Sequence, residues 1–243
     1  MRDLSSFDST VLSPPKAATP IVDRPRRRRR SLKFLIPAAL LGLVMVLLLP
    51  FAALLRVATF LYVERDVATW TAVGAGVVAA SVVVTAYAAY VWKKLTGRVR
   101  IRVVAQRVAF PLVLLYCLYG LLYLSAENVK DIQERAYFGS LHPLLRLSLS
   151  TVVLVDRDIV VTDIGRTPED YRAMGLEAQE VSLHYPQDDG FVHAVDLRTA
   201  GRGPVRNWLT NTYFRALGFH TLRHVGTADH LHVSLPGSVT RRD

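Results

Sequence analysis

Three long apolar stretches occupy most of the first half of the chain. They cover residues 34–55, 67–92 and 108–126, and none of them contains Asp, Glu, Lys, Arg or His. An α-helix of about 20 apolar residues crosses the roughly 30 Å hydrocarbon core of a bilayer. The pattern therefore predicts three transmembrane helices. Because ionisable residues mark ion and proton pathways within membranes, their absence favours an anchor over a transport or assembly subunit.

The hydrophobic pattern changes after residue 126 to the shorter periods of soluble helices and strands. We expect helices over residues 128–138, 143–149, 168–174 and 204–217, and strands over 151–155, 159–162, 191–197, 219–224 and 229–235. The helix over 204–217 has the clearest signal, because Pro204 stands at its start and Gly218 follows its last apolar residue. Residues 127–243 are thus predicted to form an α+β domain with a small, mainly antiparallel sheet.

Residues 1–33 precede the first predicted span and have no apolar period. Residues 1–23 are rich in Ser, Thr and Pro, and a run of arginines follows before residue 34. This composition predicts a disordered basic tail. The long charged lead and the long apolar stretch favour a retained anchor over a cleaved signal peptide.

The formal charge of +10 is divided unevenly along the chain. Residues 1–126 carry 17 basic and 5 acidic residues, whereas residues 127–243 carry 13 and 15. Because the excess of positive charge flanks the apolar stretches, it indicates membrane topology and excludes nucleic acid as the expected partner. By the positive-inside rule, the tail and the basic loop after the second span are cytoplasmic. Residues 127–243 are then extracytoplasmic, on a multi-pass protein of the cytoplasmic (inner) membrane whose spans contact lipid.

All seven histidines lie after residue 140, and two of them point to a metal. His230 and His232 are two residues apart in the last predicted strand, so their side chains share one face. The single cysteine, Cys117, lies in an apolar stretch and cannot form an intramolecular disulfide. Two histidines and a carboxylate from separate strands would supply three ligands and leave a fourth position for water, as in catalytic zinc sites.

Several motifs of residues 140–236 together resemble a known family. They are Ser182-Leu183-His184, then Gly190, then Ala194-Val195-Asp196-Leu197-Arg198, and finally Asp229-His230-Leu231-His232. Upstream, Ile159-Val160-Val161-Thr162 is followed by Arg166-Thr167-Pro168. This order is similar to that of the zinc D-Ala-D-Ala carboxypeptidases and D,D-dipeptidases of the hedgehog/D,D-peptidase superfamily. The resemblance does not extend to the membrane part.

The resemblance implies a zinc site and a catalytic apparatus. It makes His184, Asp196 and His232 the Zn²⁺ ligands, and either Asp229 or His230 the group that activates the water. Regular strand geometry places His230 on the ligand face and Asp229 off it. Arg166 corresponds to the arginine that holds the substrate and its developing charge in that family.

One spacing departs from the family pattern. His184 and Asp196 are twelve residues apart instead of seven, so five extra residues between them are expected to loop out. His193 is the rival first ligand. We favour His184, because residues three apart on a regular strand, such as His193 and Asp196, face opposite sides.

Together with the apolar stretches, the resemblance implies a membrane-anchored zinc metallopeptidase that hydrolyses peptidoglycan stem peptides of the cell wall, with zinc-activated water as the nucleophile. Its motifs do not distinguish a carboxypeptidase, a dipeptidase and an endopeptidase, and they carry no signal for the oligomeric state. The alternative is a non-catalytic extracytoplasmic module on a membrane anchor that binds the cell wall or a protein.

Overall fold

The computed structural model describes residues 32–98, 100–173, 175, 182–226 and 229–236. The chain divides into two compact units, residues 1–41 and 42–243. The first unit contributes only the first turns of helix α1 to the described residues. The predicted tail over residues 1–33 lies almost entirely outside them.

Among the described residues, three helices are long and apolar enough to cross a membrane, in agreement with the predicted number. They are α1 (Leu32–Arg65), α2 (Thr69–Thr96) and a run from Ile101 to Leu122 that comprises α3 (Ile101–Val104), a π-helical turn η1 (Ala105–Ala109) and α4 (Phe110–Leu122). These lengths and compositions indicate a membrane protein.

The bounds of these helices differ from the apolar stretches. Helix α1 continues through Arg56 to Arg65, so that the connection to α2 comprises only residues 66–68, with Asp66 in a left-handed conformation (φ 54°). The third helical run begins seven residues before the stretch at residue 108. Arg is a good helix former, and backbone hydrogen bonding does not stop where a helix leaves an apolar environment.

The described residues of the C-terminal part contain four α-helices. They are α5 (Ile132–Tyr137), α6 (Pro143–Val155), α7 (Pro168–Ala173) and α8 (Pro204–Leu217). Helix α8 matches its predicted bounds. The helix expected over 128–138 is replaced by α5 and two flanking 3₁₀ turns, η2 (Ala126–Asn128) and η3 (Phe138–Ser140).

The strand predicted over residues 151–155 is wrong, because this segment is the end of α6. Its β-branched residues suit a strand. However, Ser148 and Thr151 donate side-chain hydrogen bonds to carbonyls one turn earlier, and every residue from Pro143 to Val152 is buried. These hydrogen bonds and the burial of the helix up to Val152 override the strand propensity of its last turn, where Leu154 and Val155 are exposed.

A four-stranded antiparallel sheet forms the centre of this part, which confirms the predicted type of sheet. Its order is β1 (Val161–Asp163), β2 (Ala194–Arg198), β4 (His230–Ser234) and β3 (His220–His224). Asp196 of β2 lies directly opposite His232 of β4, which in turn lies opposite Leu222 of β3. These three side chains therefore share one face.

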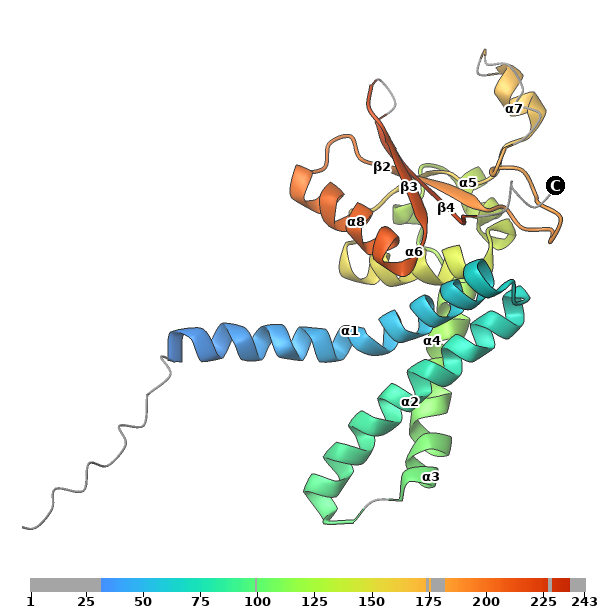
Figure 1. Cartoon of the computed structure of the whole chain (residues 1–243). Coiled ribbons are helices and arrows are strands. Elements are labelled where there is room, and N and C mark those ends of the chain that lie inside the picture. The colour runs from blue at the N-terminus through green and yellow to red at the C-terminus, as the bar shows by residue number, and fades with distance from the viewer. Residues whose placement is uncertain (1–31, 99, 174, 176–181, 227–228, 237–243) are drawn as a thin grey trace, which may run out of the picture. The chain divides into compact units, whose positions relative to one another are not determined.

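The two faces of the sheet differ in chemistry. On one face Val195, Leu197, Leu231 and Val233 are almost fully buried and belong to the same core as Phe214 and Leu217 of α8. Figure 1 shows α6 and α8 together beside the sheet, and the Tyr213 hydroxyl of α8 donates a hydrogen bond to the Ser148 carbonyl of α6. The opposite face bears the polar residues of β2 and β4.

The same hydrophobic core continues from the sheet into the helices that are long enough to cross a membrane. It contains Leu54 and Leu55 of α1 and Val113 of α4 as well as the strand residues. Helix α6 is the link: a Cβ on Gly120 of α4 would lie 3.1 Å from Leu147 of α6, and Ser150 donates a hydrogen bond to the Gly120 carbonyl. Helices α1 and α4 are therefore part of the hydrophobic core that supports the sheet.

Candidate metal centre

The structure brings His184, Asp196 and His232 together. One potential ligand atom from each lies within 4.8 Å of the other two. The Nδ1 atom of His232 is 2.8 Å from Asp196 Oδ1, and Nε2 of His184 is 3.4 Å from His232 Nδ1. The cross-strand pairing of β2 and β4 accounts for the first contact. His184 is added from the loop that precedes β2.

The residues between His184 and Asp196 form a closed loop. Gln187 and Phe191 are joined by a backbone hydrogen bond, and Gly190 makes the turn with a left-handed φ of 79°. The chain then returns beside its starting point, because the His193 amide donates to the Leu183 carbonyl. This loop therefore leaves His184 next to β2.

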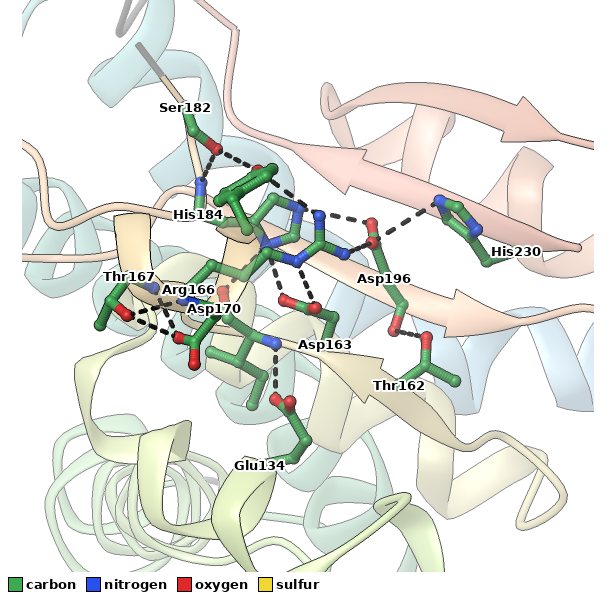
Figure 2. Close-up of polar contacts among 12 residues, drawn as sticks. Glu134, Thr162, Asp163, Arg166, Thr167, Asp170, Ser182, His184, Asp196 and His230 are labelled. Carbon is green, nitrogen blue, oxygen red and sulfur yellow. Dashed lines mark hydrogen bonds and ion pairs between the residues drawn. The ribbon is translucent and has the colours of Figure 1, made fainter. Parts of the chain in front are cut away.

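Asp163 and Arg166 hold the centre from the side of β1. The two side chains form an ion pair, with Arg166 Nε 2.5 Å from Asp163 Oδ2. Arg166 also reaches Asp196 Oδ2 at 3.3 Å (Figure 2), and its guanidinium lies over the Tyr171 ring. The arginine that was predicted to bind substrate is therefore held beside the candidate metal ligands, and part of its side chain is accessible to solvent.

The environment of His184 fixes which ring nitrogen faces the centre. Its Nδ1 atom lies 3.0 Å from the Ile164 carbonyl oxygen, which accepts a hydrogen bond, and 3.2 Å from Asp163 Oδ1, with which it forms an ion-pair contact. Nδ1 therefore carries a proton, and Nε2 points to Asp196 and His232. Histidine ligands in metal sites are commonly oriented by a carbonyl or carboxylate in this way.

The electrostatics of the centre favour a cation. Burial alone would lower the pKa of His184, but hydrogen bonds to Asp163 and Asp196 raise it to about 10. Burial would raise the pKa of Asp196, but hydrogen bonds from His184 and His232 hold it well below its usual range. The two carboxylates therefore attract positive charge at this point, either a proton on His184 or a metal ion in its place.

The two candidate bases occupy different positions. His230 Nε2 lies 3.6 Å from Asp196 Oδ2 (Figure 2), and the ring stacks on His224 with centroids 4.7 Å apart. The Asp229 carboxylate instead accepts hydrogen bonds from Thr199 at 2.5 Å and Arg223 at 2.9 Å. The hydrogen bonds from Arg223 and Thr199 lower the pKa of Asp229. As the alternation of side chains along a strand predicts, His230 lies on the side of the candidate metal ligands and Asp229 does not.

His193, the rival ligand, belongs to a second group with His142 and Asp189. Its Nε2 is 2.9 Å from the Asp189 carboxylate. His142 caps α6, because its Nδ1 accepts a hydrogen bond from the Leu144 amide. Burial lowers the pKa of His142 to about 3, so the ring is neutral and its proton is on Nε2, 3.0 Å from the Thr69 hydroxyl of α2.

The second group also makes polar contacts to the membrane-spanning helices, because His142 is hydrogen-bonded to Thr69 of α2 and Tyr62 of α1 donates a hydrogen bond to Asp189.

Sequence reasoning missed Asp163. The only signal was a carboxylate at the end of a predicted strand, three residues before Arg166.

No family model, curated protein or solved structure matches this chain.

Proposed function

We propose that the chain is a membrane-anchored zinc metallopeptidase that hydrolyses peptidoglycan stem peptides. The observation that carries the proposal is the convergence of His184, Asp196 and His232, with the His184 ring oriented by Asp163 and the Ile164 carbonyl. The motif order described above supplies the substrate class, and the positive-inside rule supplies the side of the membrane.

The donor set fits zinc better than magnesium or calcium. Zinc accepts imidazole and carboxylate ligands in tetrahedral sites, whereas the alkaline-earth ions prefer oxygen ligands only. Three protein ligands leave one position for water or substrate, the arrangement of catalytic zinc sites. When bound, zinc would supply a Lewis acid and a water with a pKa lowered to about 7.

The side chains around the centre would perform the remaining steps. His230, close to Asp196 Oδ2, is placed to take a proton from the attacking water and to deliver it to the leaving amine. Arg166 would bind the substrate or stabilise charge on its carbonyl oxygen. Asp229 is the second candidate for the proton transfer and would first have to exchange its contacts with Arg223 and Thr199.

The first experiment measures zinc in the purified full-length protein by elemental analysis, for the wild type, His232→Ala and His220→Ala. His220 is an exposed histidine on β3 and serves as the matched control. We expect one zinc per chain in the wild type and the control, and its loss in His232→Ala. A folded wild type that holds no zinc when zinc is supplied would overturn the metal centre.

Assays on wall peptides then test the chemistry. We expect the wild type to hydrolyse peptides ending in D-Ala-D-Ala or cross-linked stem peptides, and His230→Ala to lose turnover while keeping its zinc. Zinc binding without hydrolysis of either substrate would contradict the peptidase. It would favour a non-catalytic wall-binding module, for which the engagement of Asp229 by Arg223 and Thr199 already gives some support.

A further inference from the structure

Five large apolar side chains on α6 and α8 are exposed to solvent. They are Leu154 (52%), Val155 (74%), Val205 (67%), Trp208 (62%) and Leu209 (53%). Scattered exposed apolar residues are normal in soluble proteins, but a group of this size on two packed helices marks an interaction surface. We call this group the α6–α8 apolar surface.

This surface adjoins the first membrane-type helix. A hollow of about 400 Å³ lies between α6, α8 and α1, and both Val155 and Leu209 line it. On the α1 side its walls are Leu48, Phe51, Ala52 and Leu55. These four residues lie within the uncharged stretch 34–55. The hollow is therefore bounded on one side by a helix segment that belongs in lipid.

Helix α6 also lies beside α4, which belongs to the third helical run that is long enough to cross a membrane. The hydroxyls of Thr151 and Tyr116 are hydrogen-bonded to each other, and Ser150 donates to the Gly120 carbonyl. Tyr116 and Gly120 belong to the apolar stretch 108–126. Two independent sets of contacts thus place the end of α6 alongside membrane-spanning segments.

Charged residues flank the apolar surface and are paired. Arg206 forms an ion pair with Asp158, and Arg202 forms one with Asp156 at the edge of the hollow. Helices that lie in the membrane interface combine Trp and aliphatic residues on one side with arginines at headgroup depth. The α6–α8 apolar surface has this composition.

We propose that the α6–α8 apolar surface is embedded in the leaflet next to which the C-terminal part lies, and that a phospholipid acyl chain of this leaflet fills the hollow. The sheet face with His184, Asp196 and His232 is the opposite one, so the candidate metal centre would face the aqueous phase. This inference does not depend on the proposed peptidase activity.

Tryptophan fluorescence tests the proposal on the full-length chain. The protein has three tryptophans, so Trp70→Phe with Trp92→Phe leaves Trp208 as the only one. The matched control adds Trp208→Phe and Leu222→Trp, which moves the single tryptophan to an exposed position on the opposite face of the sheet. Both proteins are reconstituted into bilayers of phosphatidylcholine with or without brominated acyl chains.

We expect brominated chains to quench most of the emission of Trp208 and little of that of the residue-222 tryptophan, with iodide in the buffer showing the reverse order. Equal quenching of the two by brominated lipid, or stronger iodide quenching of Trp208, would overturn the proposal. Variants that unfold would be recognised by identical emission in lipid and in denaturant.

Leu209→Trp in place of Trp208 then repeats the measurement at a second position of the surface, with the same expected outcome.

Discussion

Asp163 connects the two charged parts of the candidate centre. It accepts a hydrogen bond from Arg166 Nε and lies 3.2 Å from His184 Nδ1, so a single carboxylate holds both Arg166 and the candidate ligand His184. Residues that orient metal ligands commonly contribute as much as a ligand contact, because they fix the tautomer and the direction of the lone pair. Asp163 is thus a positioning residue in this centre.

We therefore expect Asp163→Asn to weaken zinc binding by about 10–100-fold. Asp170→Asn is the matched control: its carboxylate accepts hydrogen bonds from Thr167 at the start of α7 and touches no ligand. Competition with a chromogenic chelator measures both affinities. Equal affinities in the two variants would show that Asp163 does not orient His184.

Glu134 carries a pH dependence of folding. Burial and the nearby charge of Asp163 raise its pKa from 4.5 to about 7, although its carboxylate accepts a hydrogen bond from the Ile164 amide. A carboxyl with a raised pKa holds its proton longer in the folded state, so stability falls as the pH rises between these two values. Glu134→Gln should remove this loss and keep the acceptor.

Thermal unfolding in detergent from pH 4.5 to 7 measures the difference between wild type and Glu134→Gln. We expect the midpoint of the wild type to fall relative to that of the variant across this window. Parallel curves would mean that Glu134 ionises with an ordinary pKa in the folded chain.

The three candidate metal ligands could be predicted from the sequence, whereas the residues that orient them could not. His184, Asp196 and His232 stand out by residue type and motif, and strand alternation separates His230 from Asp229. The role of Asp163 depends on the bulged pairing of β1 with β2, where the register shifts between Val161 and Asp163. A regular strand pattern contains no information about such a shift.

At the scale of elements, the contact between α1 and α2 depends on one glycine. A Cβ at Gly76 would lie 2.4 Å from the Leu54 carbonyl oxygen, whereas a Cβ at Gly74 would meet nothing within 4 Å. The sequence shows both glycines, but only the structure shows which of them faces the neighbouring helix. Small residues at such positions allow helix backbones to approach closely in membranes.

Gly76→Ala should therefore lower the free energy of unfolding by about 1–3 kcal/mol, because the two helices must separate. Gly74→Ala should be neutral or slightly stabilising, since Ala favours the helix by about 1 kcal/mol. Unfolding of the full chain in mixed micelles with increasing SDS measures both. A Gly76→Ala protein as stable as Gly74→Ala would place α1 and α2 further apart than described.

Helix α6 shows where element prediction fails. Its last residues, Thr-Val-Val-Leu-Val, favour a strand by composition, and no residue at the true helix end signals the continuation. The helix persists because α4 and α8 supply packing and hydrogen-bond partners, Gly120 and Tyr213 among them. By contrast, α8 has local signals at both ends and could be bounded from the sequence alone.

At the scale of the whole molecule, the composition suggests a separable anchor and domain, but the core crosses that boundary. Leu54 and Leu55 of α1 and Val113 of α4 belong to the same hydrophobic core as Leu197 and Leu231 of the sheet. A fragment of residues 127–243 would lose the partners of α6 and expose its inner surface. The membrane helices therefore contribute to folding as well as to anchoring.

We expect residues 127–243 expressed alone to aggregate in detergent-free buffer or to bind a hydrophobic dye strongly, because buried α6 side chains such as Leu145 and Leu147 would be uncovered. The comparison is residues 42–243 in detergent, which retain the complete second unit. Size-exclusion chromatography and thermal unfolding measure both proteins. A monomeric 127–243 fragment that unfolds cooperatively without detergent would show that the sheet needs no support from α1 and α4, and the membrane helices would then be an anchor alone.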